Sequence, residues 1–309
     1  MLSSYNRRYK IMDSANAASA ASPRNSGSLA QRLLSAALLL PLLIVLVWWS
    51  VWSVAATVIL ATVVSLIELY SAFRQGGYHP RMLVGIGSAL ALILAVGFQA
   101  TFGADLLLPV VTFVIVLSLV AELAYHQHPG SLPSWGLTLA GAFYIAWLLS
   151  HFILLRSLSV PALHDSIFTP LGMQPGVAWI YYACAITWLQ DTSAYFVGRQ
   201  FGRHKLAPIL SPKKTWEGAA GGMIGAIITG IVCVPLLGLP ITLLQGALLG
   251  LVGGIVGPLG DLSESLIKRQ VGLKDAGNLI PGHGGILDRA DSLLFTIPIL
   301  YYLIRLFAA

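Results

Sequence analysis

Charged residues are scarce in this chain of 309 residues, of which 10% are charged and 57% are hydrophobic. A soluble domain usually carries about 25% charged residues, because polar side chains cover its surface. So few charges cannot cover a soluble globule. The composition therefore excludes a soluble domain and predicts a polytopic integral membrane protein.

Cysteine is nearly absent: the chain has Cys184 and Cys233, and both lie in apolar segments. We therefore expect no disulfide framework and interpret both cysteines as small buried residues without a redox role. The net charge of +6 raises the question of a nucleic-acid partner. Because the basic residues flank apolar segments, their placement favours membrane topology and no nucleic acid.

Apolar runs long enough to cross a bilayer recur along the chain, and they predict an all-α protein with about nine transmembrane helices. The predicted spans are 33–49, 54–73, 82–98, 106–125, 136–156, 177–197, 218–238, 241–260 and 292–307. Residues 1–31 are polar and predict a disordered cytoplasmic tail. The remaining chain divides into N-terminal transmembrane helices over 32–176 and a C-terminal membrane domain over 177–309, which carries the polar motifs.

The distribution of Lys and Arg predicts the orientation. With the N-terminus in the cytoplasm, all of the 18 basic residues except Arg156 and Arg305 fall in cytoplasmic segments. Cytoplasmic loops carry such an excess of Lys and Arg. We therefore expect a cytoplasmic N-terminus, a C-terminus on the opposite side, and both polar motifs on the cytoplasmic face.

The first polar motif begins near the end of the sixth predicted span with Asp191 and continues to Ser211, Lys213 and Lys214. An acid at the membrane edge, directly followed by a basic loop, favours a functional role for Asp191 over a packing role. Lys213 and Lys214 follow a proline that fixes the backbone. They are equally consistent with phosphate contacts and with ordinary cytoplasmic positive charges.

The second polar motif lies between the last two predicted spans. Asp261, Ser265 and Lys268 have the spacing of one helix face and offer a carboxylate, a hydroxyl and a cation. Asp288 and Asp291 also share a face and open the last span. Two acid-bearing helix ends that meet across a folded loop would make a site for a divalent cation.

The loop between these helix ends contains His283, Gly284 and Gly285. Glycines let the backbone approach a ligand and present N–H groups to an anion. His283 is either a ligand contact or a loop histidine without a task, and Glu264 is either a solvated charge or a salt-bridge partner. The combination of carboxylates, cations and glycines indicates phosphate chemistry at a membrane surface.

The stretch 265–291 strongly resembles the signature of the phosphatidate cytidylyltransferase (CDP-diacylglycerol synthase) family. The matching positions are Ser265, Lys268, Arg269, Lys274, Asp275, Gly277, Pro281, His283, Gly284, Gly285, Asp288, Arg289 and Asp291. The stretch 191–218 is similar to further elements of the same family. Ala290 departs from the pattern, and we expect it to affect packing more than chemistry. The resemblance covers the C-terminal half, and Glu68-Leu69-Tyr70 echoes one more family element.

This resemblance implies transfer of a cytidylyl group from CTP to phosphatidic acid in a bacterial cytoplasmic membrane, with the active site facing the cytoplasm. Asp261, Ser265, Lys268 and Asp288 are the implied catalytic residues. Asp261 and Asp288 would bind Mg²⁺, with Asp291 as a third ligand or a supporting acid. The implied substrate contacts are Lys213, Lys214, Arg269, Ser211, Asp191, His283, Gly284 and Gly285. A second cation such as K⁺ and a homodimer are implied as well.

Two other classes of protein compete with this interpretation. A related membrane enzyme that uses CTP on another lipid, such as a polyprenol or phytol kinase or an archaeal-type CDP-lipid synthase, would keep a basic nucleotide site but should differ across 265–291. A transporter would carry intramembrane charges along a substrate path. Against a transporter, the charges lie at one membrane face and no inverted repeat is evident.

Overall fold

The computed structural model describes residues 29–124, 130–274, 277 and 284–308. The predicted tail, residues 1–31, and His283 therefore lie outside the described residues, apart from 29–31, which begin the first helix. Each of the nine predicted apolar runs overlaps a helix. The all-α prediction is thus confirmed for the described residues, with one short β-hairpin as an addition that the sequence pattern did not indicate.

The elements follow one another in this order: α2 (Leu29–Trp49), α3 (Val51–Gln75), α4 (Met82–Phe102), α5 (Leu107–Leu123), α6 (Ser131–Ala142), the π-helix η1 (Phe143–Trp147), α7 (Leu148–Arg156), the 3-10 helix η2 (Thr169–Leu171), α8 (Pro175–Phe201), β1 (Lys205–Ala207), β2 (Ser211–Thr215), α9 (Trp216–Leu237), α10 (Leu243–Gln270) and α11 (Leu287–Phe307). Among the described residues, six helical segments are long and apolar enough to cross a membrane. These are α3, α4, the continuous segment from α6 to α7, α9, α10 and α11. The chain is therefore a helical membrane protein.

The boundary between α2 and α3 is a capped turn at Ser50, between two tryptophans. Ser53 N donates to Ser50 Oγ at 3.0 Å, and Ser50 N donates to Ser53 Oγ at 3.1 Å. This reciprocal capping satisfies two backbone donors that a helix start leaves free. The turn lies between Trp49 and Trp52, which are both exposed.

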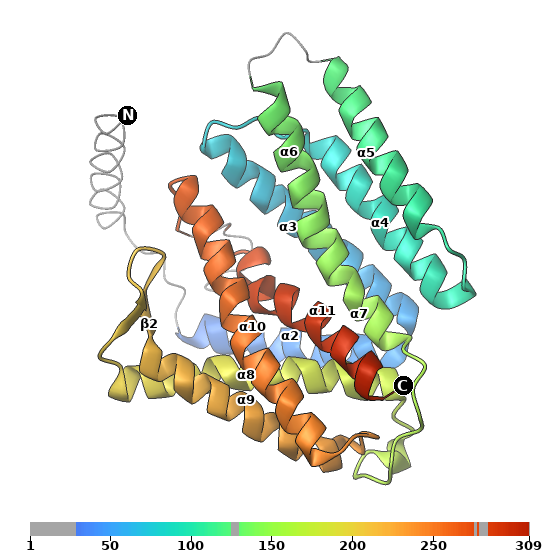
Figure 1. Ribbon diagram of the computed structural model, residues 1–309, viewed down its shortest axis with the longest axis vertical. Coiled ribbons are helices and arrows are strands. Elements are labelled where there is room, and N and C mark those ends of the chain that lie inside the picture. The colour runs from blue at the N-terminus through green and yellow to red at the C-terminus, as the bar shows by residue number, and fades with distance from the viewer. Residues whose placement is uncertain (1–28, 125–129, 275–276, 278–283, 309) are drawn as a thin grey trace.

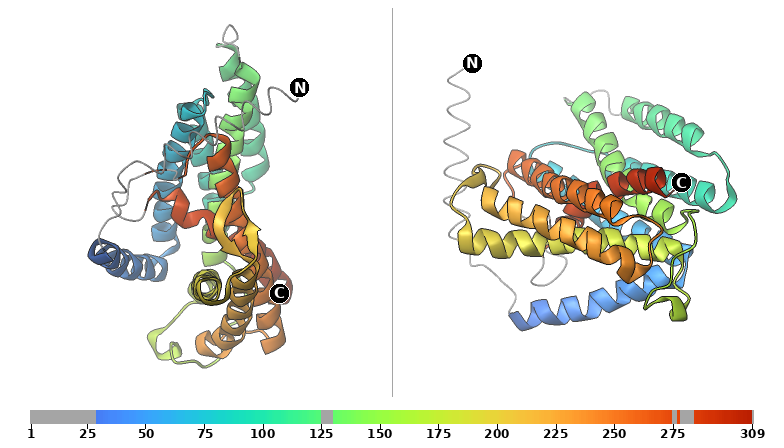
Figure 2. Two further views of the ribbon diagram at one scale, coloured as in Figure 1. Left: turned by 90° about the vertical axis from the view of Figure 1, so that its left-hand side faces the viewer. Right: turned by 60° about the horizontal axis from the view of Figure 1, so that its bottom comes forward.

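Figure 1 shows α8, α9 and α10 side by side, with the β-hairpin at the end where α8 stops and α9 begins. Helices α3 to α7 form a second group, and α11 packs against α3, α7, α8 and α10. Figure 2 shows α2 on the outside of this assembly, where it contacts α3 and α8. Because α11 contacts both groups, its N-terminus lies where residues from the two halves can meet.

Glycine makes the close packing of α8, α9 and α10 possible. A Cβ atom on Gly250 of α10 would overlap the carbonyl oxygen of Ala226 in α9, and one on Gly230 would overlap the oxygen of Gly246. Small residues let helices approach closely in lipid, where apolar burial alone does not drive their association. These glycines therefore serve helix packing.

Polar side chains join the helices of the N-terminal group. Arg81, just before α4, makes a two-pronged contact with Glu122 of α5, with N–O distances of 3.0 and 2.9 Å. Tyr70 of α3 donates to the carbonyl oxygen of Thr138 in α6 at 2.6 Å. Such bonds are favoured between membrane helices, because lipid offers a polar group no alternative partner.

Candidate active site

The hairpin brings the first polar motif to the second. Lys214 on β2 forms an ion pair with Asp261 of α10, with Nζ 2.7 Å from Oδ2, and it also donates to the carbonyl oxygen of Pro258 at 3.4 Å. Thr215 ends the hairpin and caps α9, because its Oγ1 accepts from Gly218 N at 3.2 Å. The cap fixes the direction in which β2 leaves α9. The two motifs, about 50 residues apart in the chain, thus form one site.

Three carboxylates from three helices gather around this ion pair. Asp191 of α8, Asp261 of α10 and Asp291 of α11 interact electrostatically with one another, and Lys214 interacts with Asp191 as well as Asp261. Asp191 is exposed, and the other two acids are half-buried, so a ligand can reach them. Carboxylates that interact in this way repel each other and are held best with a cation among them.

Lys268 is the centre of a second charged group, on neighbouring turns of α10 and α11. Its Nζ lies 2.6 Å from Asp288 Oδ1 and 3.2 Å from Glu264 Oε1. Glu264 is fully buried, so it is a salt-bridge partner, and the alternative of a solvated charge is wrong. The carboxyl groups of Glu264 and Asp288 therefore share one ammonium group on this side of the site.

The glycine pair shapes the loop that precedes α11. Gly284 has φ of 81°, the left-handed region that favours glycine. Gly285 N donates to Asp288 Oδ2 at 2.9 Å, so the carboxylate bridges Lys268 and the loop backbone. Asp288 therefore fixes the loop as well as the lysine.

Glu68 of α3 holds the same loop from the other half of the molecule. Its carboxylate accepts from Ile286 N at 3.2 Å and from Leu287 N at 2.9 Å, at the N-terminus of α11. Glu68 is 8% exposed. A carboxylate at this end of a helix satisfies free N–H groups and complements the helix dipole. The sequence pointed to Glu68 only as an echo of a family element and gave it no role.

Gly277 and Gly285 explain how Glu68 fits so tightly against this backbone. A Cβ atom on Gly277 would lie 2.5 Å from Glu68 Oε1, and one on Gly285 would lie 2.6 Å from Oε2. Any larger residue would push the carboxylate from the N-terminus of α11. The glycine at 285 thus serves the contact with Glu68, beyond the ligand cradle that its motif indicated.

The remaining predicted residues lie around this core. Ser265 donates to Asp261 Oδ1 at 3.4 Å, and Arg269 donates to the carbonyl oxygens of Leu210 and Leu273 at 3.4 and 3.0 Å. Arg269 therefore ties the hairpin to the end of α10. Lys213 is exposed on β2, and Ser211 is half-buried at its start. The structure brings Asp261 to Lys214 and Asp288 to Lys268.

Within the described ranges, no three His, Cys, Asp or Glu side chains are arranged as a ready-made metal site. The donor chemistry nevertheless fits Mg²⁺, which prefers carboxylate oxygens together with water and substrate phosphates. Asp191, Asp261 and Asp291 interact through like charge, and the ammonium of Lys214 lies against Asp261 as a positive counter-charge. A divalent cation bound among these carboxylates would neutralise their charge.

Comparison with known proteins decides between the interpretations of this geometry. A sequence model of the Cytidylyltransferase family matches residues 30–307. The chain belongs to this family. The match includes the N-terminal helices, whereas the sequence motifs supported the resemblance over the C-terminal half.

Relatives of this family member share substantial identity with it. The phosphatidate cytidylyltransferase of Synechocystis is 34% identical over 288 residues, which cover 89% of this chain and 96% of that protein. The enzyme of the same name from Bacillus subtilis is 43% identical over 172 residues, 56% of this chain and 58% of that protein. Phosphatidate cytidylyltransferase 5 of Arabidopsis thaliana is 35% identical over 272 residues, 82% of this chain and 66% of that protein. The family predicted from the motifs is confirmed.

Proposed function

We propose that this protein transfers the cytidylyl group of CTP to phosphatidic acid, giving CDP-diacylglycerol and pyrophosphate for phospholipid synthesis. The observation that carries the proposal is the ion pair of Lys214 with Asp261, which unites both family motifs in one site. A phosphate oxygen of the lipid attacks the α-phosphorus of CTP and forms a new P–O bond. The bond from that phosphorus to the oxygen bridging the α- and β-phosphates breaks, and pyrophosphate leaves.

The residues of the site suit a reaction between two anions. Neutralising and positioning their phosphates is the main task, and the attacking phosphate needs no strong general base. Lys213 and Lys214 on the hairpin and Lys268 and Arg269 on α10 supply four positive charges around the acids. Ser211 and Ser265 offer hydroxyl groups, and the backbone at Gly284 and Gly285 completes the cradle, with His283 beside it in the sequence.

The acids are the proposed metal ligands. Asp261 and Asp288 would hold Mg²⁺, with Asp291 as a third ligand or a supporting acid. Asp191 interacts electrostatically with Asp261 and Asp291, which supports a place for it in the same set or next to the nucleotide. A bound Mg²⁺ would polarise phosphate oxygens and stabilise the leaving pyrophosphate. A second cation such as K⁺ stays a prediction from the family resemblance.

The membrane arrangement is part of the proposal. Nine spans, a cytoplasmic N-terminus and a C-terminus on the opposite side place the site at the cytoplasmic face of a bacterial inner membrane. The concentration of Lys and Arg in the segments near the site supports this orientation. CTP would arrive from water, and the lipid would enter from the inner leaflet. Two such chains would form a homodimer.

The test uses purified full-length protein in mixed micelles with phosphatidic acid, Mg²⁺ and CTP labelled at either the α- or the γ-phosphate. We expect the α-label to enter the lipid phase and the γ-label to appear in pyrophosphate. Transfer of the γ-label to lipid would replace the proposal with a lipid kinase. Failure of both labels to move, with several lipid acceptors, would overturn it in favour of transport.

A further inference from the structure

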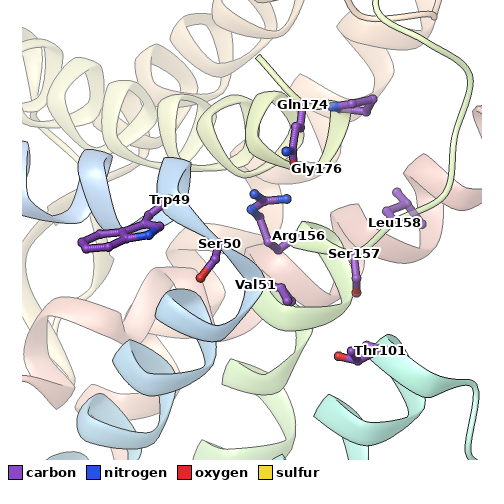
Figure 3. Close-up of a pocket in the computed structure, with 11 residues that line it drawn as sticks. Trp49, Ser50, Val51, Thr101, Arg156, Ser157, Leu158, Gln174 and Gly176 are labelled. Atoms are coloured by element: carbon purple, nitrogen blue, oxygen red, sulfur yellow. The ribbon is translucent and has the colours of Figure 1, made fainter. Parts of the chain in front are cut away.

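A cavity of about 590 Å³ lies far from the candidate active site. It is at the N-terminal ends of α3 and α8, whereas the site is near their C-terminal ends. Val51, which lines it, is 17 positions before Glu68 in α3, and at 1.5 Å per residue the two ends are separated by about 25 Å. Figure 3 shows the guanidinium group of Arg156 between the Trp49–Ser50 turn and the start of α8 at Gly176. We propose that this cavity binds the phosphate of an anionic phospholipid from the leaflet opposite the active site.

Arg156 is the reason to expect an anion. It is 7% exposed, and its Nε donates to the carbonyl oxygen of Val47 at 3.0 Å. Among the described residues it makes no other hydrogen bond and no ion pair, so the four N–H groups of its two terminal nitrogens are available. A guanidinium group matches the two oxygens of a phosphate with parallel N–H donors. A cation this deeply buried without an acid partner is costly unless an anion joins it.

Helix ends of both kinds meet around Arg156. The helices α3 and α8 both begin at the cavity, with Ser50 and Gln174 as their N-cap residues. Helix N-termini carry partial positive charge and favour anions. The C-termini of α2, α4 and α7 line the cavity too and carry the opposite partial charge, so the guanidinium group of Arg156, the one charged side chain of the lining, is what favours an anion. Gly176 permits the close approach, because a Cβ atom there would overlap the carbonyl oxygen of Arg156.

The surroundings indicate a lipid headgroup rather than a free ion as the source of the phosphate. Trp49, which lines the cavity, is 76% exposed, and Trp52, next to the lining residue Val51 in the chain, is 53% exposed. Exposed tryptophans collect at the level of lipid headgroups. The cavity volume is also several times that of one phosphate, which leaves room for glycerol and ester groups. Arg156 is one of the two basic residues that depart from the positive-inside pattern, and this site would account for it.

The experiment measures lipid retention by native mass spectrometry of the full chain, purified in detergent and incubated with phosphatidylglycerol or phosphatidylcholine. We expect Arg156→Gln to weaken phosphatidylglycerol binding about tenfold, as for the loss of a charge-assisted pair of hydrogen bonds. Arg305→Gln is the matched control, because Arg305 is an exposed cation predicted on the same side. It should bind like the unmodified protein, and phosphatidylcholine should bind equally to all.

A second variant and a competition experiment complete the test. If Arg156→Gln does not fold, Thr101→Trp fills the cavity from an exposed position and leaves the bond to Val47 intact; it should also lose the lipid. Inorganic phosphate in zwitterionic detergent should not compete with phosphatidylglycerol. Equal lipid retention by Arg156→Gln, Thr101→Trp and the control would overturn the proposal, and competition by inorganic phosphate would reassign the site to a free anion.

Discussion

The two halves of the molecule contribute to the site by different means. In α8, α9 and α10, backbones touch through glycines such as Gly230 and Gly250, and the helix ends carry the acids and lysines of the site. In α3 to α7, polar side chains such as Arg81 and Glu122 join the helices, and one residue, Glu68, reaches the described part of the site through hydrogen bonds.

The two halves therefore have different roles at the candidate site. The C-terminal half places charges that can meet phosphates and a cation, whereas the N-terminal half holds the N-terminus of α11 in place through Glu68. A side chain that acts only through backbone N–H groups should influence where the loop lies without contacting the substrate. Substitutions in the two halves should therefore fail in different ways.

The largest effect is expected in the acid cluster. Asp261→Asn and Asp291→Asn should each lower kcat about 100-fold or more, because a site aligned to developing charge loses that much when one group is removed. The label-transfer assay measures this loss. Asp165→Asn is the control, an exposed acid in the segment between α7 and α8, and it should keep full activity. Full activity in either cluster variant would remove that acid from the site.

A smaller effect that combines folding and activity is expected at Lys268. Lys268→Met leaves Glu264 and Asp288 without their shared cation, and the loss of one partner of a buried pair costs about 3 kcal/mol of unfolding free energy. Thermal unfolding in detergent measures the destabilisation. The double variant with Glu264→Gln should recover much of the stability but little of the activity. Recovery of both would show that Lys268 serves the fold alone.

Substitution of Glu68 is the most specific test of the different roles of the two halves. Glu68→Gln keeps the shape but turns an amide N–H₂ toward one of the two backbone donors, so we expect about a tenfold lower kcat, in the range of a lost charge-assisted bond. Glu122→Gln is the matched control, since both acids are buried, at 8% and 6% exposure. It should lower thermal stability but leave the kcat of folded protein unchanged. Equal kcat values for both variants would contradict a positioning role of Glu68.

The smallest effect on activity is expected from the glycine contacts. Gly250→Ala should destabilise the protein by about 2 kcal/mol, because the new methyl group overlaps the carbonyl oxygen of Ala226. Gly87→Ala is the control, with open space around its Cβ position. Alanine is the better helix former by about 0.8 kcal/mol, so the control should be neutral or stabilising. A stable Gly250→Ala protein would contradict the close packing of α9 and α10.

The sequence predicted the helices well, because runs of apolar residues are long and unambiguous in a membrane protein. It also predicted that Asp261, Ser265 and Lys268 share a helix face, which α10 confirms. The hairpin at 205–215 escaped prediction, since its short strands contain three lysines and a proline and lack alternating hydrophobic residues. The number of spans that cross the membrane stays a prediction.

Within the site, sequence reasoning found the residues of the motifs but not the partners from elsewhere. Glu68 contacts Leu287 across 219 positions, and nothing local in the sequence indicates which helix end it meets. Beside the echo of a family element at Glu68, the available signal was an acid inside an apolar segment, which marks a functional or paired residue. The pairing of Asp261 with Lys214, and of Asp288 with Lys268, likewise depends on helix packing that no spacing rule provides.

The most direct test of the account is the binding of Mn²⁺, as a spectroscopic substitute for Mg²⁺, measured by electron paramagnetic resonance with CTP present. We predict that the unmodified protein and Asp165→Asn bind Mn²⁺, and that Asp261→Asn and Asp291→Asn lose this binding while folding normally. If both cluster variants bound Mn²⁺ as tightly as the unmodified protein, the carboxylates of α10 and α11 would not form the metal site.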